Sequence, residues 1–370
     1  MNIARSSPRL NLALSIILPA FNEEKYILSI LESLSALAEC FEQVEILVID
    51  GRSSDATCEL VTSFSKSSLP GNLIVRLIDN TNRFQAFALN LGLQHATHPV
   101  CIRFDCHSCF ASSKNLCQSI MSVAAMFCDS TASDSFSGIG FKQRFAFTPN
   151  VVQAGLFCLS HSPILSGFRA YRYAVNSMYT SKTVWLFAIK RELALKVGGF
   201  ASDGLANEDF SFNQDLIKMT GKPLFLFADL HIYYYPRSSY LDVFRQYFNY
   251  GFSRSSRDLA SGQFRLIPRL FVVARAFVFV LGPVLFSLAA LCTHGLFLVF
   301  YYTVIAALVA IFYRIDRGHF LRHYHLMRSR SWGFLFYGWI FSPICFLIVW
   351  LASFSGSVVA LIKTRSRLDD

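Results

Sequence analysis

The stretch LSIILPAFNEE (14–24) decides the expected fold. A short apolar run ends at Pro19, and Asn22, Glu23 and Glu24 follow it directly. An apolar run of this length, closed by a turn signal, is typical of a strand that is buried on both faces. We expect Asn22 to cap the next helix, with both glutamates in its first turn, where the helix dipole favours negative charge. The stretch therefore predicts one strand–helix unit of an α/β sheet.

The same alternation of strand and helix recurs along the first hundred residues. Apolar runs at VEILVID (44–50), LIVRLID (73–79) and PVCIRFD (99–105) predict three more strands. Helical spacing is expected from about Asp55 and over residues 84–96. Strands that alternate with helices through short loops predict a doubly wound, mostly parallel, Rossmann-like sheet.

The pattern is weaker from residue 111 to residue 180 and then becomes clear again. WLFAIKRELALKVGGF (185–200) predicts a strand, a short helix and a Gly-Gly turn. NEDFSFNQDLIKMTG (207–221) predicts a helix that ends at Gly221, a favourable C-cap residue. PLFLFADLHIYYYPR (223–237) supplies one or two closing strands.

Three carboxylates stand at or just past the ends of predicted strands: Glu23, Asp50 and Asp105. Open α/β sheets bind their ligands at this edge. There is no Gly-rich phosphate loop, so we expect the edge to bind a nucleotide through a metal ion and a few hydrogen bonds. Asp50 and Glu23 are the candidates for base or ribose contacts, and the alternative is that each is a loop or helix-capping carboxylate.

Asp105 is the candidate metal ligand, because hard divalent cations prefer oxygen and take their remaining ligands from phosphate and water. His107 is a candidate second ligand, and it would suit Mn2+ better than Mg2+. A structural or phosphate-facing role is the alternative for His107. Arg83, before the predicted helix 84–96, is a candidate for the diphosphate, with a solvated surface charge as the alternative.

Glu208 and Asp209 begin a predicted helix after a Gly-containing loop. A carboxylate here can serve as the general base that deprotonates an acceptor hydroxyl. The alternative is that both residues only complement the helix dipole.

Composition separates the chain into two parts. The chain is 53% hydrophobic and only 16% charged, with a mean hydropathy of +0.41. Residues 1–236 carry 19 basic and 19 acidic side chains, whereas residues 237–370 carry 15 and 5. Because the basic excess flanks apolar segments, anionic lipid head groups are the expected partner and nucleic acid is not.

We therefore expect an enzyme domain at 1–236, an interfacial amphipathic helix pair at 237–270 and a membrane domain at 271–370. The apolar stretches 271–292, 294–313 and 333–362 predict three or four spans, since the last is either one tilted span or a hairpin folded at Ser353–Gly356. The basic loop that follows the second stretch predicts a multi-pass plasma (inner) membrane protein with a cytoplasmic enzyme domain. Buried helices of a large soluble protein are the alternative. Ten scattered cysteines indicate free thiols in a reducing compartment.

The motifs, in this order, resemble the inverting GT-A glycosyltransferases of glycosyltransferase family 2, most of all the bacterial succinoglycan-type exopolysaccharide enzymes. The matching pieces span about residues 14–255 and are SIILPAFNEEKYI, EILVIDGRSSDAT, ALNLGL, IRFDCHS, VGGF with NEDFSFNQDL, and RQYFNYGFSR.

The resemblance implies that Asp50 and Glu23 contact the nucleotide, usually UDP, that Asp105 holds the metal and diphosphate, and that Asp209 is the base. Two departures matter. The usual Asp-x-Asp is Asp105-Cys106-His107 here, and the Gln-x-x-Arg-Trp motif of processive synthases is absent around Gln246. One sugar transferred per event is therefore expected.

The expected reaction moves a single hexose from a UDP-sugar to a polyprenyl-diphosphate-linked glycan. Glu208 is a candidate for the acceptor site, and Arg245, Arg254 and Arg257 are candidates for the acceptor diphosphate, with generic lipid anchoring as the alternative. Two rival functions are a polyprenyl-phosphate sugar synthase and a catalytically inactive scaffold. The scaffold would have other polysaccharide assembly proteins as partners.

Overall fold

The computed structural model describes residues 10–110, 112–145, 150–161, 176–180, 183–202, 208–260, 262, 345, 348–349 and 351–363. The chain divides into two compact units. The first comprises Met1–Ala146, Ala170–Gly204 and Glu208–Tyr235, and the second comprises Phe147–Arg169, Leu205–Asn207 and Pro236–Asp370.

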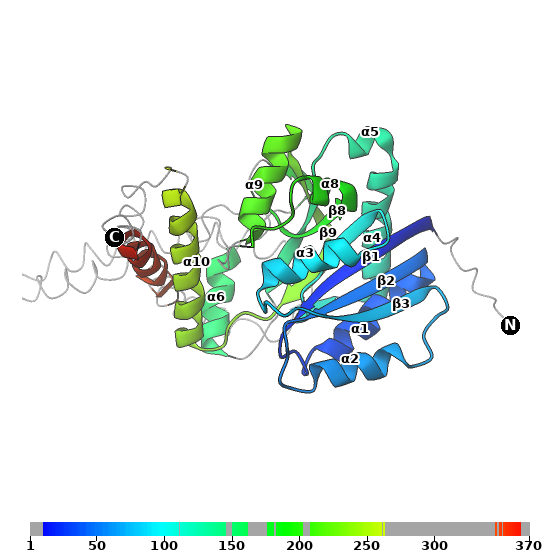
Figure 1. Cartoon of the computed structure of the whole chain (residues 1–370), viewed down its shortest axis with the longest axis horizontal. Helices are drawn as coiled ribbons and strands as arrows, with labels where there is room; N and C mark the ends of the chain where they lie inside the picture. Colours follow the sequence, from blue (N-terminus) through cyan, green and yellow to red (C-terminus); the bar gives the residue numbers. More distant parts are fainter. Residues whose placement is uncertain are drawn as a thin grey trace, which may run out of the picture. The chain divides into compact units, whose positions relative to one another are not determined.

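The first unit is built on one sheet of nine described strands (Figure 1). The strand order is β3-β2-β1-β4-β8-β6-β9-β5, and β7 also pairs with β9. The strands are β1 (Leu10–Ala20), β2 (Phe41–Asp50), β3 (Leu73–Asp79), β4 (Val100–Arg103), β5 (Ser108–Phe110), β6 (Ile139–Phe145), β7 (Met178–Thr180), β8 (Trp185–Lys190) and β9 (Leu224–Tyr234).

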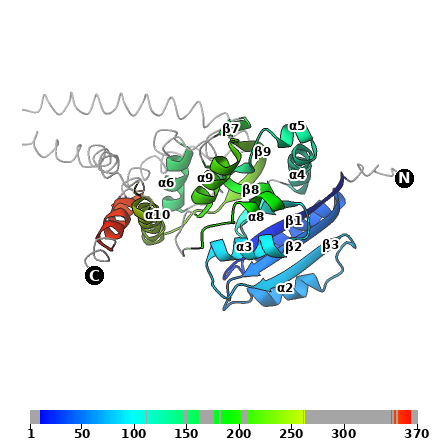
Figure 2. The ribbon, with the colours of Figure 1, turned by 45° about the horizontal axis from the view of Figure 1, so that its top comes forward.

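Helices cover both faces of this sheet, and Figure 2 shows α3 and α8 on the opposite side of β1–β3 from α2. The helices of the first unit are α1 (Ile27–Ser35), the 3-10 turn η1 (Ala36–Glu39), α2 (Thr57–Ser65), α3 (Gln85–His95), α4 (Ser113–Cys128), α5 (Ser130–Ser133), α8 (Arg191–Lys196) and α9 (Glu208–Thr220).

The apolar runs at the start of the chain are buried on both faces, as the sequence predicts. In β2, Val44, Ile46 and Val48 enter the core under α1 and α4, whereas Leu47 and Ile49 enter the core under α3. Consecutive side chains of a strand point to opposite faces, so a strand between two helical layers needs apolar residues at every position.

The sheet is mixed, which corrects the expectation of a mostly parallel one. The pairs β1–β2, β1–β4, β2–β3 and β6–β9 are parallel, and β4–β8, β6–β8, β5–β9 and β7–β9 are antiparallel. A parallel neighbour requires a crossover connection. The segment between β4 and β8 instead includes strands β5, β6 and β7, which enter the same sheet, and β8 runs back alongside β4.

The assignment of Asn22 as a helix cap is wrong. Helix α1 begins at Ile27, and the carbonyl of Glu23 accepts hydrogen bonds from the N–H groups of Tyr26 and Ile27 at 2.9 Å each. Asn22 lies in the left-handed region, with φ at 56°, and its side-chain oxygen accepts from the N–H of Ser54 at 2.8 Å. Asn tolerates this backbone conformation better than most residues, so it shapes a loop here.

The second unit contains α6 (Val151–His161), α10 (Tyr240–Ala260) and a helical segment over residues 351–363. α10 is one continuous helix up to Ala260, and the rest of the segment in which a helix pair was expected lies almost wholly outside the described residues. It packs closely against the segment 351–363: an added Cβ at Gly251 would collide with the backbone of Ser353, and one at Gly356 would collide with the backbone of Phe248. The helix continues through Ser353–Gly356, so the chain does not fold back there.

Within the ranges given above, no helix has both the length and the apolar character needed to cross a membrane. The expected spans 271–292 and 294–313, and half of the stretch 333–362, lie outside the described residues.

Helix α3 depends on a glycine where it crosses β1. A Cβ added at Gly92 would overlap the side chain of Ile17, which is fully buried. We expect Gly92→Ala to lower the free energy of unfolding by about 1 kcal/mol, because overpacking costs about 1–3 kcal/mol and the better helix propensity of alanine offsets about 1 kcal/mol. Urea denaturation measures this, with Gly71→Ala, which meets nothing within 4 Å, as control. Equal stability of the two variants would contradict this packing argument.

Candidate active site

The loops that follow β1, β2 and β3 are tied to one another at the carboxyl edge of the parallel strands. Ala20 is in register with Asp50, and Asp50 with Asp79. Each of the three loops contains one non-glycine residue in the left-handed region: Asn22 (φ 56°), Arg52 (φ 61°) and Arg83 (φ 62°). Such conformations are disfavoured and cluster at functional sites, which makes this edge of the sheet a candidate active site.

Asp50 is fixed by the turn that follows it. One carboxylate oxygen accepts from the Ser53 N–H at 2.9 Å and the other from the Ser53 hydroxyl at 2.6 Å. Burial raises the pKa of the Cys58 thiol to about 11, and a hydrogen bond to Asp50 adds to this shift. Asp50 is only 4% exposed, so its carboxylate is oriented before any ligand arrives.

Glu23 and His107 come together beside this turn. The Nδ1 atom of His107 lies 3.4 Å from Oε1 of Glu23, and the N–H of Glu23 donates to the Thr57 hydroxyl at 2.8 Å. The His107 ring packs edge-on against Tyr234, with the ring centroids 4.7 Å apart. The structure therefore gives His107 a carboxylate partner and an aromatic one.

Asp105 lies two residues past the end of β4 and is bonded to a buried arginine of that strand. The Nε atom of Arg103 donates to Oδ1 of Asp105 at 3.1 Å, and the Arg103 side chain is only 3% exposed. Burial lowers the pKa of Arg103, but Asp105, Asp209 and Glu208 raise it by more, so the guanidinium stays charged. A buried charge is tolerated when it is paired in this way.

The other end of the same guanidinium faces the carboxylates that begin α9. Its Nη1 atom lies 3.6 Å from Oδ1 of Asp209. In the amide orientation that satisfies both neighbours, Gln85 accepts from Arg103 Nη2 at 2.6 Å and donates to Glu208 Oε1 at 3.1 Å. The structure thus brings Asp105, Glu208 and Asp209 around one side chain, although Asp105 and Asp209 stand about a hundred residues apart in the sequence.

Glu208 and Asp209 differ in their surroundings. Burial, with the charge of Asp209, raises the pKa of Glu208 to about 8 against the lowering effect of Arg103. The Asp209 side chain is 32% exposed. Paired carboxylates in unlike environments divide acid and base roles between them. Here the buried Glu208 is the protonated member at neutral pH, and Asp209 is the member that faces solvent.

Arg103 and Gln85 were not predicted from the sequence. An arginine inside the otherwise apolar run VCIRF is the signal that could have identified Arg103, because a charge in a strand buried on both faces needs partners. Nothing in the sequence marks Gln85, which begins an ordinary helix.

The remaining candidates are four arginines, one in the first unit and three on α10 in the second. Arg83 is exposed, and its guanidinium sits 5.9 Å from the ring centroid of Phe21. Arg245 and Arg254 are exposed residues of α10, and Arg245 forms an ion pair of 3.7 Å with Asp242. Exposed pairs of this kind contribute little to stability. Their predicted roles toward diphosphates, and that of Arg257, stay predictions.

The fit of a divalent cation can be judged at Asp105. Oδ1 accepts the bond from Arg103, and Oδ2 has no recorded partner in the described part of the chain. Across those same residues, no group of three or more His, Cys, Asp and Glu side chains is arranged to hold a metal ion. A single carboxylate oxygen fits a cation that draws its other ligands from phosphate and water.

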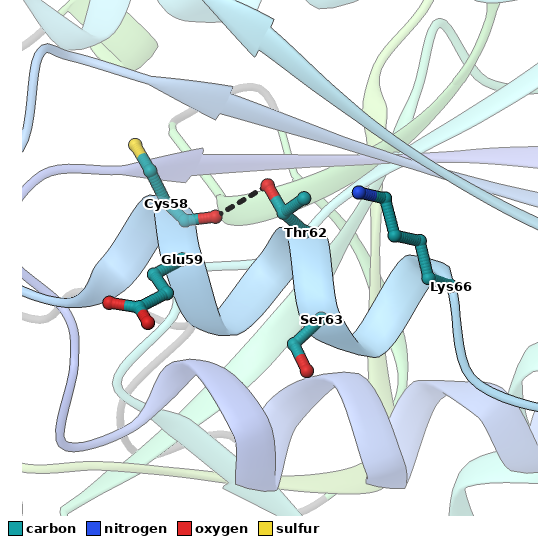
Figure 3. A pocket seen from close by; sticks show the side chains of 5 residues that line it. All are labelled: Cys58, Glu59, Thr62, Ser63 and Lys66. Carbon is teal, nitrogen blue, oxygen red and sulfur yellow. Dashed lines mark hydrogen bonds between the residues drawn. The ribbon is translucent and has the colours of Figure 1, made fainter.

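A separate depression lies along helix α2 and is lined by Cys58, Glu59, Thr62, Ser63 and Lys66 (Figure 3). The Thr62 hydroxyl there donates to the Cys58 carbonyl one turn earlier, at 2.8 Å. This is a local helix bond, and the depression gathers none of the predicted site residues.

Residues 15–122, which include Glu23, Asp50 and Asp105, match the family model described as Glycosyl transferase family 2. The chain therefore carries a glycosyltransferase family 2 domain, which confirms the resemblance stated from the motifs.

Two relatives and one solved structure are similar to the chain. It is 27% identical over 238 residues to dolichyl N-acetyl-alpha-D-glucosaminyl phosphate 3-beta-D-2,3-diacetamido-2,3-dideoxy-beta-D-glucuronosyltransferase of Methanococcus voltae, across 64% of this chain and 71% of the relative. It is 24% identical over 247 residues to the succinoglycan biosynthesis protein ExoA of Rhizobium meliloti (strain 1021), across 66% and 69%. A mannosyltransferase from Pyrobaculum calidifontis, solved with GDP-Man and Mn2+, superposes with a TM-score of 0.52 at 17% identity, across 91% of this chain and 89% of that one. This last likeness confirms the GT-A-like α/β fold.

The raised pKa of Glu208 predicts a pH dependence of stability. A carboxyl whose pKa rises from 4.5 to about 8 on folding stabilises the folded state below 4.5, and that contribution is lost as the pH rises toward 8. We expect the melting temperature of the wild type to fall over this range relative to that of Glu208→Gln, by about 2–4 °C per kcal/mol lost. Thermal melts of both proteins across this range measure it, and parallel curves would show that Glu208 titrates normally.

Proposed function

We propose that the chain transfers one hexose from a UDP-sugar to a lipid-linked glycan in the synthesis of an exopolysaccharide or cell-surface glycan, with inversion at the anomeric carbon. The observation that carries the proposal is the single guanidinium of Arg103, which faces both Asp105 and Asp209. A donor-binding carboxylate and an acceptor-facing carboxylate then lie at one site.

The proposed roles follow from position and exposure. Asp50, held by Ser53, and Glu23 contact the nucleotide, and Arg83 contacts its diphosphate. Asp105 offers its free oxygen to a divalent cation, Mn2+ or Mg2+, with His107 as the candidate second ligand. Such a cation, when bound, offsets the charge that develops on the diphosphate leaving group.

Asp209 is the proposed base. It accepts the proton of the acceptor hydroxyl, whose oxygen forms a bond to the anomeric carbon while the bond from that carbon to the diphosphate oxygen breaks. Attack from the face opposite the leaving group inverts the centre. Protonated Glu208 lies next to the base and lines the acceptor side.

The choice of acceptor rests on the relatives. The Methanococcus voltae relative is named for a dolichyl-phosphate-linked sugar, and the Rhizobium meliloti relative for succinoglycan biosynthesis. The first name supports a lipid-linked glycan as the acceptor, and its linkage through a polyprenyl diphosphate is part of our proposal. The apolar, basic region after residue 270 would keep the enzyme at a cytoplasmic plasma membrane surface. Arg245 and Arg254 are the proposed contacts to the lipid diphosphate.

The test uses the full chain in detergent with Mn2+, a lipid-linked oligosaccharide extract and a panel of UDP-sugars. We expect UDP release with one donor, dependent on the extract, and a loss of about 10²–10⁴-fold in Asp209→Asn, the range typical of a general base. Asp215→Asn, an exposed carboxylate on the same helix, is the matched control and should keep full activity.

Two other outcomes would redirect the proposal. Release with polyprenyl phosphate that carries no sugar would identify a polyprenyl-phosphate sugar synthase. No release by the wild type above that of Asp209→Asn, with any donor, would favour an inactive scaffold or a donor that is not a UDP-sugar.

A further inference from the structure

The charge distribution around Arg103 is unusual for a β-strand residue. Arg103 lies on β4, between core helices on both faces, and only 3% of its side chain is exposed. Three carboxylates raise its pKa against the effect of burial: Asp105, Asp209 and Glu208. Removing any one of them changes how the single positive charge is shared among the others.

The three nitrogens of the Arg103 guanidinium have different partners. Nε is bonded to Asp105 at 3.1 Å, and Nη2 is bonded to the Gln85 oxygen at 2.6 Å. Nη1 is buried and has no hydrogen-bond partner among the described residues, although it points at Asp209 from 3.6 Å. A charge-assisted bond is about 2.7–2.9 Å long, so a shift of roughly 0.8 Å at the start of α9 would form it.

A buried N–H without a partner costs free energy. That cost, with the nearby Asp209 oxygen, favours movement of α9 toward β4. Catalytic hydrogen bonds that are long without substrate often shorten in the substrate complex.

We infer that Arg103 is a positioning residue that links the donor carboxylate Asp105 to the acceptor-side base Asp209. A change in the charge or ligand of one carboxylate then alters how strongly the other binds its own ligand. Gln85 extends this link to Glu208 through its amide. The inference deepens the proposed function and rests on it, since it takes Asp105 as the carboxylate beside the metal and diphosphate.

The link predicts a specific thermodynamic coupling. When Asp209 becomes neutral, the guanidinium interacts more strongly with Asp105 and competes with a cation for that carboxylate. The affinity for Mn2+ with UDP should therefore depend on Asp209, and the dependence should require Arg103. A purely structural Arg103 would lower stability without producing this dependence.

The test is a double-mutant cycle on the full chain in detergent, with the dissociation constant of UDP in the presence of Mn2+ measured by titration calorimetry. We expect Asp209→Asn to weaken UDP binding about 3–10-fold in the wild-type background and less than about twofold in the Arg103→Gln background, since only the direct effect of the charge then persists. An equal change in both backgrounds overturns the inference.

Two controls separate the link from folding. Arg103→Lys keeps a positive charge but not the planar fork that reaches two carboxylates, so it should restore the melting temperature more than the coupling. It also replaces Arg103→Gln in the cycle if that variant does not fold. The second control is Arg76, another arginine that lies on a strand, β3. It is bonded to the buried Glu45 at 2.9 Å, and its Nε atom is buried without a hydrogen-bond partner among the described residues. In Arg76→Gln the effect of Asp209→Asn should stay at its wild-type size.

The possible outcomes separate a failure of the Arg103 inference from a failure of the proposed function. If the wild type does not bind UDP with Mn2+, the proposed function and the inference both fall. If it binds and the cycle shows no coupling, the proposed function stands and only the role of Arg103 falls.

Discussion

The site depends on one constraint, namely that a guanidinium buried between two helical layers must have carboxylates around it. Arg103 is removed from water by the core of the first unit, and an isolated charge there would be prohibitive. The carboxylates that compensate it come from the turn after β4 and from the start of α9. Pairing therefore aligns two elements that the sequence separates by a hundred residues.

The loops at this edge are positioned by local bonds of the same kind. Asp50 is held by Ser53, the Asn22 oxygen accepts from Ser54, and Glu23 donates its N–H to Thr57. The first bond closes the turn after β2, and the other two join the loop after β1 to the residues between β2 and the start of α2. The left-handed residues permit the tight turns that these bonds require. The edge is consequently organised in the absence of any ligand.

The part of the fold made of local patterns could be predicted from the sequence. β1 to β4 follow from apolar runs, and α9 and its end at Gly221 follow from periodicity and a C-cap. The direction of β8 could not, because antiparallel entry depends on a long excursion whose sequence pattern is weak. Asn22 was misassigned because asparagine suits both helix caps and left-handed turns. Asp105 and Asp209 were found as separate motifs, but their connection through Arg103 exists only in three dimensions.

The protonation of Glu208 bears on how an anion approaches the edge. A neutral Glu208 leaves the group that it forms with Asp105, Asp209 and Arg103 with one negative charge fewer than an ionised Glu208 would. At a separation of about 6 Å and an effective dielectric constant of about 20, one charge alters the energy of a second by about 3 kcal/mol. The apolar surroundings of one carboxyl group thus lower the electrostatic barrier that an acidic surface would otherwise present to a diphosphate.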